Sequence, residues 1–180
     1  MSSGIPVTMV EAARTGGPRE IEALLQAAWP DAYRLALAIL GQKEPAEDAA
    51  QEACIAMFRS VGSLRRADAF RTWSYRIIVR EALKQKKLRV AEDASGTAFY
   101  EEDPSSSLDL WRALNALPFA LRTAVVLHYF ESLSTPEIGA ILGIPQATVR
   151  FRLFTARRRL QHLLSDTAQN ARESEKSYAL

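Results

Sequence analysis

Arginine side chains are concentrated in one stretch near the end of this 180-residue sequence, QATVRFRLFTARRRL at positions 146–160. No acidic residue occurs between Gln146 and Ser165. The planar guanidinium group presents a fork of N–H donors that matches phosphate oxygens. Arginines without nearby acids therefore predict contact with a nucleic acid.

Helical geometry separates this stretch into two faces. At about 100° per residue, one narrow arc holds the apolar side chains Val149, Leu153, Ala156 and Leu160. The opposite face carries Phe151 and Phe154 among the basic residues. The alternative is an ordinary solvated helix, but such faces mix charges of both signs and rarely display two phenylalanines. The pattern favours a helix whose outer face covers nucleic acid, where the two aromatics meet thymine methyl groups.

The residues before this helix predict how it is positioned. Ser134 and Glu137 form the S-x-x-E pattern of a capping box, and Pro136 lies in the first turn, where its missing N–H costs nothing. Gly143 can adopt the left-handed conformation that ends a helix, and Pro145 begins the next one. Two short helices joined by a tight turn form a helix-turn-helix motif, whose second helix enters the DNA major groove.

A second basic row lies in the middle of the chain. Residues 69–87 have helical periodicity, with apolar rows that include Phe70, Trp73 and Tyr75. A further row of this helix is wholly basic: Arg76, Arg80, Lys84 and Lys87. Aromatic residues beside a basic row can bind single-stranded nucleic acid by stacking and charge neutralisation. Core aromatics with a solvated basic row remain the alternative.

The helix that begins near Pro45 has two distinct faces. One is an apolar stripe of Ala50, Cys54, Met57, Phe58 and Val61. The other combines Asp48, Gln51, Glu52 and Ile55. An apolar residue beside acids and an amide indicates either a protein-binding surface or an ordinary exposed face with one isolated Ile.

These patterns predict an all-α fold of two small helical domains, the C-terminal one containing the helix-turn-helix. Residues 1–18 are expected to form a mobile arm, 19–89 the first domain, 90–107 a flexible acidic linker, 108–165 the second domain and 166–180 a polar, frayed tail. Within the first domain, helical segments 20–28 and 31–40 flank Pro30, which starts or kinks the second of them.

Several function classes have no support. Cys54 is the only cysteine, so no intrachain disulfide can form, and the two histidines lack a metal-ligand pattern. No nucleophile elbow, phosphate-binding loop or dinucleotide motif occurs, so we expect a non-enzymatic protein without cofactors. No signal-peptide pattern or membrane-spanning stretch is present, which predicts a cytoplasmic protein that does not insert into membranes.

Three segments together resemble the extracytoplasmic-function class of bacterial RNA polymerase sigma factors. AEDAAQE at 46–52 is similar to that family's region 2 signature, and FRTWSYRI at 70–77 to the segment that reads and opens the minus-10 element. Residues 117–160 resemble region 4 almost throughout. The resemblance implies a transcription initiation factor that binds core RNA polymerase and directs it to promoters.

The resemblance also implies roles for single residues. The surface for the polymerase β′ clamp helices comprises Asp48, Gln51, Glu52 and Ile55. A base-capturing loop is implied at residues 62–68. The residues implied for minus-10 DNA are Arg65, Arg66, Trp73, Arg76, Arg80, Lys84 and Lys87. Minus-35 DNA would be bound by Thr148, Arg150, Phe151, Arg152, Phe154, Thr155, Arg157 and Arg158. Further implied partners are the β flap and an anti-sigma factor.

Some positions depart from the family pattern. Arg80 and Lys84 stand where an Asn and an Asp are usual, and Phe151 and Thr155 where a Ser and an Arg are frequent. These positions face DNA in the family, so we infer no promoter sequence. A stand-alone helix-turn-helix regulator with an N-terminal dimerisation module, and a scaffold that only sequesters an anti-sigma partner, remain alternatives at this point.

Overall fold

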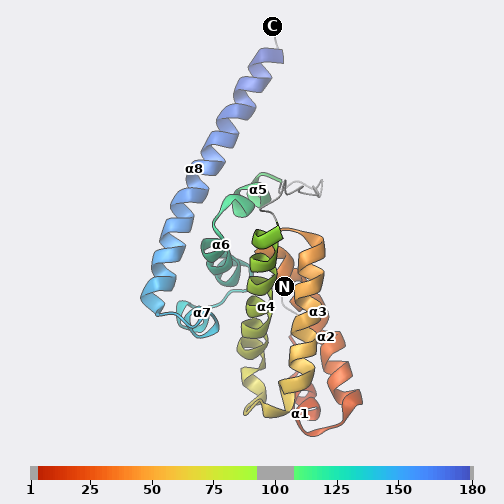
Figure 1. Ribbon diagram of the computed structural model, residues 1–180. Coiled ribbons are helices and arrows are strands. Elements are labelled where there is room, and N and C mark those ends of the chain that lie inside the picture. Colours follow the sequence, from red (N-terminus) through yellow and green to blue (C-terminus); the bar gives the residue numbers. More distant parts are fainter. Residues whose placement is uncertain (1–3, 93–107, 179–180) are drawn as a thin grey trace.

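The computed structural model describes residues 4–92 and 108–178, in which every regular element is a helix (Figure 1). The first range contains α1 (Val7–Thr15), α2 (Pro18–Leu40), α3 (Lys43–Ser60) and α4 (Phe70–Glu92). The second contains α5 (Leu108–Ala116), α6 (Phe119–Val125), α7 (Thr135–Leu142) and α8 (Gln146–Tyr178). The prediction of an all-α protein with two helical units is confirmed for these ranges.

Helices α2, α3 and α4 pack together as the centre of the N-terminal half. Their contact surfaces are apolar: Leu24, Leu35, Ile39, Met57 and Ile78 are all buried. Pro30 lies inside α2 without ending it, so the two predicted segments are parts of one helix. Gly41 ends that helix with φ 76°, a left-handed conformation that glycine adopts without steric cost.

The N-terminal residues differ from the prediction of a mobile arm. Residues 7–15 form α1, which packs on α2 and on the short helices η1 (Val61–Ser63) and η2 (Ala67–Ala69). Val10 and Ala13 are fully buried there. The small, polar composition of residues 1–18 conceals these two core positions, because a helix of nine residues needs few apolar side chains to bury one face.

In the C-terminal half, α6 continues directly into the π-helical turn η4 (Val126–Phe130). The chain then passes through Ser132, which has a φ of 54°, and enters α7. Helices α6 and α7 pack against the first part of α8 around Leu127, Ile138 and Val149.

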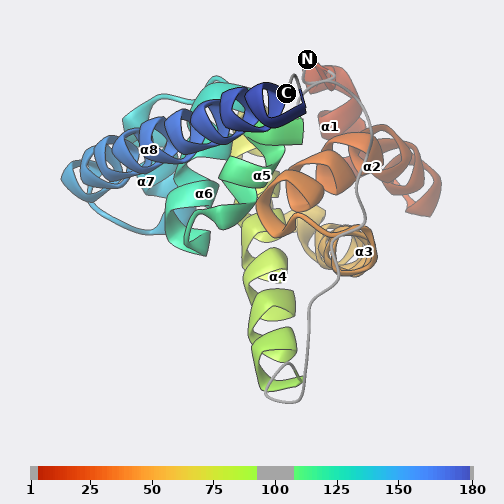
Figure 2. The same ribbon diagram turned by 90° about the horizontal axis from the view of Figure 1, so that it is seen from above.

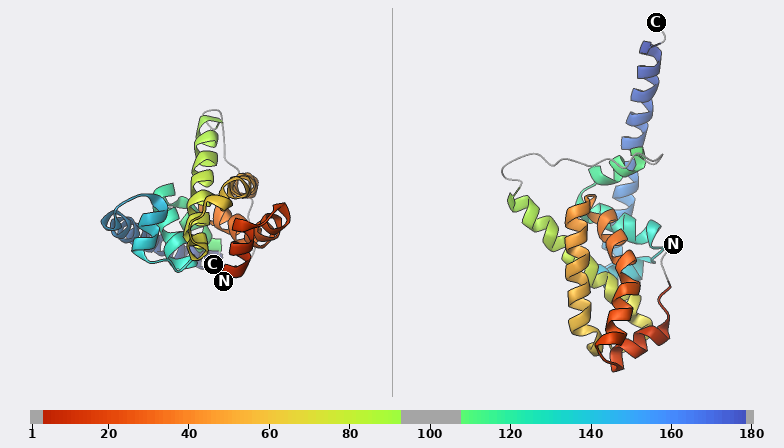
Figure 3. Two further views of the ribbon diagram at one scale, coloured as in Figure 1. Left: turned by 90° about the horizontal axis from the view of Figure 1, so that it is seen from below. Right: turned by 90° about the vertical axis from the view of Figure 1, so that its right-hand side faces the viewer.

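The predicted frayed tail also differs from the structure. Helix α8 continues through residues 166–178, since no glycine or proline follows Pro145 to stop it. Its last turns extend away from the rest of the molecule (Figures 1 and 3). The predicted linker begins within the last turn of α4, and its residues 93–107 lie outside the described ranges.

The two halves are in contact. Helix α4 lies between α2 and α3 on one side and α7 on the other (Figures 1 and 2). None of the helices described combines the length and low charge needed to cross a membrane.

Candidate nucleic-acid and protein interfaces

The helix-turn-helix is built as the sequence predicts. Glu137 accepts hydrogen bonds from the backbone amide of Ser134 at 2.8 Å and from its hydroxyl at 2.5 Å. Gly143 has a φ of 66° and ends α7. At Gly139 an added Cβ would lie 2.9 Å from the carbonyl oxygen of Ile144, so only glycine permits this close approach of turn and helix. The turn is therefore held rigidly, which fixes the direction of α8.

All eight residues predicted for minus-35 DNA lie on α8 outside its buried side, with Arg152 and Arg157 at the edges. Val149, Leu153 and Ala156 are buried on the inner face, as predicted. Phe151 and Phe154 are 68% and 57% exposed. The remaining members are exposed (Arg150, Arg157, Arg158) or half-buried (Thr148, Arg152, Thr155). A soluble helix thus presents two aromatic rings and several guanidinium groups on one surface.

Contacts within the C-terminal half restrain part of this face. The guanidinium of Arg158 lies 6.0 Å from the ring centre of Phe154, a cation–π distance. Arg157 donates a hydrogen bond of 2.6 Å to the hydroxyl of Tyr129. Phe151 is the more exposed of the two aromatic rings, and Arg150 beside it is also exposed.

The basic row on α4 is exposed along its length: Arg76, Arg80, Lys84 and Lys87. The carboxylate of Glu81, on the same helix, is buried beside this row. It accepts a hydrogen bond from Arg80 at 3.1 Å and forms an ion pair with Lys84 at 2.7 Å. Trp73, predicted to join the row at the DNA, is half-buried against Phe70, with ring centres 5.7 Å apart.

Arg76 makes a contact that the sequence did not predict. It donates a hydrogen bond of 2.7 Å to the backbone carbonyl of Ala140, which belongs to α7 in the other half of the molecule. One member of the basic row on α4, although exposed, is therefore hydrogen-bonded to the helix-turn-helix unit in this structure.

A buried polar cluster at the same interface surrounds Glu131. Its carboxylate accepts hydrogen bonds from Tyr75 at 2.5 Å and from Arg34 at 3.2 Å. Arg71 donates to the backbone carbonyl of Glu131. Sequence reasoning missed this cluster, because its members lie on separate helices and follow no local spacing.

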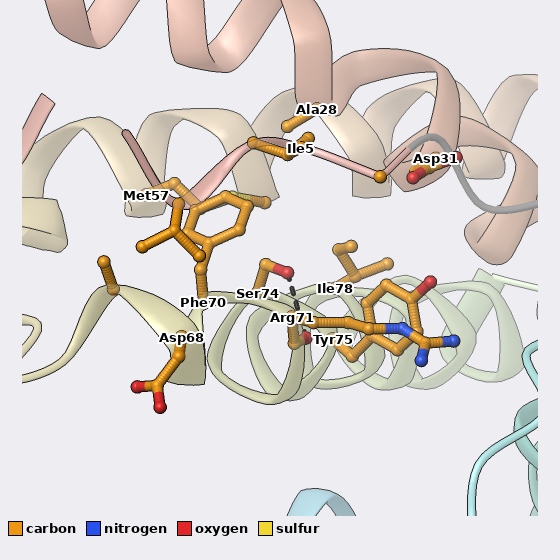
Figure 4. A pocket seen from close by; sticks show the side chains of 13 residues that line it. Ile5, Ala28, Asp31, Met57, Asp68, Phe70, Arg71, Ser74, Tyr75 and Ile78 are labelled. Atoms are coloured by element: carbon orange, nitrogen blue, oxygen red, sulfur yellow. Dashed lines mark hydrogen bonds between the residues drawn. The ribbon is translucent and has the colours of Figure 1, made fainter. Parts of the chain in front are cut away.

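The loop between α3 and α4 holds the other two residues predicted for minus-10 DNA. Arg65 is exposed, and Arg66 forms an ion pair with Asp68. The hydrogen bond from Arg66 lowers the pKa of the Asp68 carboxyl below its ordinary value. Beside this loop is a hollow of about 290 Å³, in which Ile5 lies across from Phe70, Ser74 and Ile78 (Figure 4).

The mixed face of α3 is exposed at every predicted position: Asp48, Gln51, Glu52 and Ile55. Phe58, predicted to join the buried stripe, is instead 47% exposed. Its position three residues after Ile55 places it on the same surface, so two apolar side chains rather than one stand beside the acids. Cys54 is half-buried between the faces, and burial raises the pKa of its thiol.

Metal binding has no structural support in the part of the chain described. Across residues 4–92 and 108–178, no three His, Cys, Asp or Glu side chains come together where they could hold a metal ion.

Comparisons with known proteins match both halves. Residues 24–89 match the family described as Sigma-70 region 2, and residues 107–160 match Sigma-70, region 4. The chain is 36% identical to RNA polymerase sigma factor SigV of Bacillus subtilis over 132 residues, which cover 70% of this chain and 80% of SigV. It is 34% identical to the ECF RNA polymerase sigma factor SigW of the same species over 155 residues, covering 74% and 83%.

The fold has counterparts among solved structures. The co-crystal structure of the sigma factor RpoE with the anti-sigma factor NepR from Bartonella quintana aligns with a TM-score of 0.68 and 24% sequence identity. The alignment covers 82% of this chain and 98% of that chain. The structure of CnrH in complex with the cytosolic domain of CnrY aligns with a TM-score of 0.64 and 22% identity, covering 89% of this chain and 97% of that chain. At this level of identity the likeness concerns the fold.

Proposed function

Because the chain belongs to the extracytoplasmic-function class of RNA polymerase sigma factors, we propose that the exposed faces of α3, α4 and α8 are its working surfaces. The protein is a transcription initiation factor that binds core RNA polymerase and directs it to promoters. Region 4 reads the minus-35 element, and region 2 reads and opens the minus-10 element. Sigma factors are not catalysts, so these surfaces act by binding alone.

The outer face of α8 binds the minus-35 major groove in this proposal. The observation that carries it is the pair of exposed rings, Phe151 and Phe154, opposite a buried apolar side. Exposed aromatic surface in a soluble protein calls for a partner, and the major groove offers the thymine methyl group. The arginines beside them neutralise phosphates and fix the register of the helix on the duplex.

The mixed face of α3 docks on the β′ clamp helices. Asp48, Gln51 and Glu52 supply charge and hydrogen bonds at its rim, while Ile55 and Phe58 supply apolar area. This combination of an apolar centre and a polar rim is typical of protein interfaces. Phe58 is added here to the residues that the sequence alone suggested.

Minus-10 DNA is bound by the row on α4 together with Arg65 and Arg66. Glu81 holds Arg80 and Lys84 in place without cancelling the net positive charge of the row. In this structure Arg76 is bonded to Ala140 of region 4, so region 4 must move away from α4 before Arg76 can reach DNA. We therefore propose that the two halves are in contact in the free protein and separate when it binds polymerase.

An anti-sigma factor is a further proposed partner, and the cytoplasm is the proposed compartment. The aligned RpoE structure contains the anti-sigma factor NepR, and CnrH is bound to a cytosolic domain of CnrY. By analogy with these complexes, we propose that this chain also binds an anti-sigma factor. The proposed limits of the two domains remain 19–89 and 108–165.

Run-off transcription with purified core polymerase tests the proposal. The protein should co-purify with core polymerase and support transcription from selected promoters, and double charge reversal on α3 should reduce both. A protein that binds duplex promoter DNA alone, without binding core polymerase, would instead be a stand-alone regulator.

A further inference from the structure

Helix α1 packs directly against the loop that joins α3 to α4. Val10 and Ala13 are buried on α1, which contacts the short helices η1 and η2, and the loop residues Val61, Leu64 and Ala67 are buried as well. The loop therefore has an apolar underside that rests on α1 and an exposed side that carries Arg65 and Arg66. The backbone of this loop would be free to shift on an apolar contact alone, because such contacts are not directional.

Arg14, in the last turn of α1, supplies a directional contact. Its Nε donates a hydrogen bond of 2.5 Å to the carbonyl oxygen of Leu64, and its Nη2 donates one of 3.1 Å to the carbonyl oxygen of Arg65. Its Nη1 is paired with Glu11 at 2.5 Å, within α1. The side chain is 20% exposed, so most of it is removed from water.

This geometry fixes two successive peptide units. The guanidinium is planar and its N–H groups form a rigid fork, so bonds to consecutive carbonyls define the orientation of the backbone between them. Hydrogen bonds from a charged donor are also about twice as strong as neutral ones. Further along, Arg66 is bonded to Asp68. Both of these side chains are exposed and belong to the loop, so the hydrogen bonds that tie the loop to α1 come from Arg14. The exposed side chain of Arg65 projects from the segment that Arg14 holds.

We propose that Arg14 is a positioning residue for minus-10 recognition: it holds the loop at 62–68 in the conformation that presents Arg65 and Arg66 to the opened strand. This inference rests on the proposed role of that loop in reading the minus-10 element. Arg14 does not touch the DNA itself. The sequence predicts only a mobile arm at residues 1–18, whereas the bonds between α1 and the loop give this segment a function in promoter recognition.

Selection of preferred minus-10 sequences with the reconstituted holoenzyme tests the inference. Arg14→Ala should reduce discrimination at one minus-10 position about tenfold, as expected for loss of a hydrogen bond from a charged group. Affinity for core polymerase and minus-35 preference should stay at the parental values. Arg14→Lys keeps the charge but not the fork and should recover part of the discrimination. Arg19→Ala removes the same charge from the exposed start of α2 and should change nothing.

Hydrogen exchange on the free protein provides a second readout. Amides at 62–68 should exchange faster in Arg14→Ala, while amides in the centre of α3 should be unaffected. If Arg14→Ala proves too unstable for the selection experiment, Arg14→Lys is used instead, and its discrimination at the minus-10 position should also be lower than that of the parent. Parental discrimination in a folded Arg14 variant would overturn the inference.

A parallel variant separates this inference from the role of the loop. The double substitution Arg65→Ala with Arg66→Ala should lose minus-10 discrimination if the loop reads DNA. If that double variant loses discrimination and Arg14→Ala retains it, only the positioning role is wrong. If both retain it, the role of the loop fails and the positioning role fails with it.

Discussion

Tyr75 and Glu131 meet in a buried hydrogen bond between the two halves of the molecule, although they are 56 positions apart in the chain. The tyrosine hydroxyl of α4 donates to the carboxylate at 2.5 Å, and Arg34 of α2 reaches the same carboxylate. A buried carboxylate is stable only with such partners. The contact therefore ties region 4 to α4, the helix that also carries Arg76.

Tyr75→Phe should weaken this docking. It removes the hydroxyl donor while keeping the ring, and leaves a buried carboxylate with one fewer hydrogen bond, which costs about 1–3 kcal/mol. Small-angle X-ray scattering of the free protein should show a larger fraction of separated halves. Tyr129→Phe is the matched control, because that hydroxyl is bonded to Arg157 on the surface of region 4. Equal scattering from the parent and Tyr75→Phe would mean that this bond does not hold the halves together.

Charge reversal on α3 should weaken binding to core polymerase. Asp48→Lys with Glu52→Lys replaces two exposed acids on the proposed docking face and removes no contact from the core. Changing charges at the rim of an interface mainly lowers the rate of association and alters its salt dependence. Affinity measured by fluorescence anisotropy should fall, while thermal unfolding stays as in the parent. Glu22→Lys reverses one exposed charge on α2, outside the docking face, and its affinity should match the parent.

The local architecture could be predicted from sequence, and the contacts between the halves could not. Ser134, Glu137 and Gly143 signal the turn through backbone chemistry that depends on neighbouring residues only. The buried side of α8 follows from helical periodicity. Glu131 gives no such signal, because Tyr75 and Arg34 come to it through the packing of separate helices.

Two predictions failed for reasons of packing. Phe58 satisfies the spacing of the buried stripe on α3, but helical spacing alone does not say how wide the buried arc is, and this ring falls outside it. Residues 1–18 are predicted to form a mobile arm, yet residues 7–15 form α1, which buries one face through Val10 and Ala13. Sequence thus predicted the buried side of α8 but missed what holds the loop before α4.

Acid should remove the stabilisation provided by the α7 capping box. The hydrogen bonds from the side chain and backbone of Ser134 lower the pKa of Glu137. Because this pKa is lower in the folded state, the stabilisation is complete above the ordinary pKa of glutamate and is lost as pH falls through the lowered value. Urea unfolding of the parent and Glu137→Gln from neutral pH to about pH 3 should show two curves that converge in acid. If the difference in free energy of unfolding between the two proteins stayed constant over this pH range, the Glu137 carboxylate would not be the source of the stabilisation.

Neutralising the basic row on α4 should impair opening of the minus-10 duplex more than minus-35 binding. Each lost phosphate contact lowers the dependence of log affinity on log salt by about 0.7–0.9. Arg80→Ala is the cleaner substitution, since the only partner of Arg80 described here, Glu81, is on the same helix, whereas Arg76→Ala also removes the bond to Ala140. Permanganate footprinting should show less reactive thymine in the opened region for both variants. If Arg80→Ala opened the minus-10 duplex to the same extent as the parent, the basic row would be an ordinary solvated surface.

Phe151→Ala should change which minus-35 sequences are preferred without affecting folding. The ring is 68% exposed, so its removal should alter the free energy of unfolding by no more than about 0.5 kcal/mol, as for other surface positions. If the ring contacts a thymine methyl group, discrimination at one or two base pairs should fall by about 1–3 kcal/mol. Val149→Ala, at a fully buried position of the same helix, should give the reverse result, with lower stability. Selection of minus-35 sequences beside a melting curve for each variant decides the matter: an unchanged preference with a large fall in melting temperature would show that Phe151 serves packing and not base recognition.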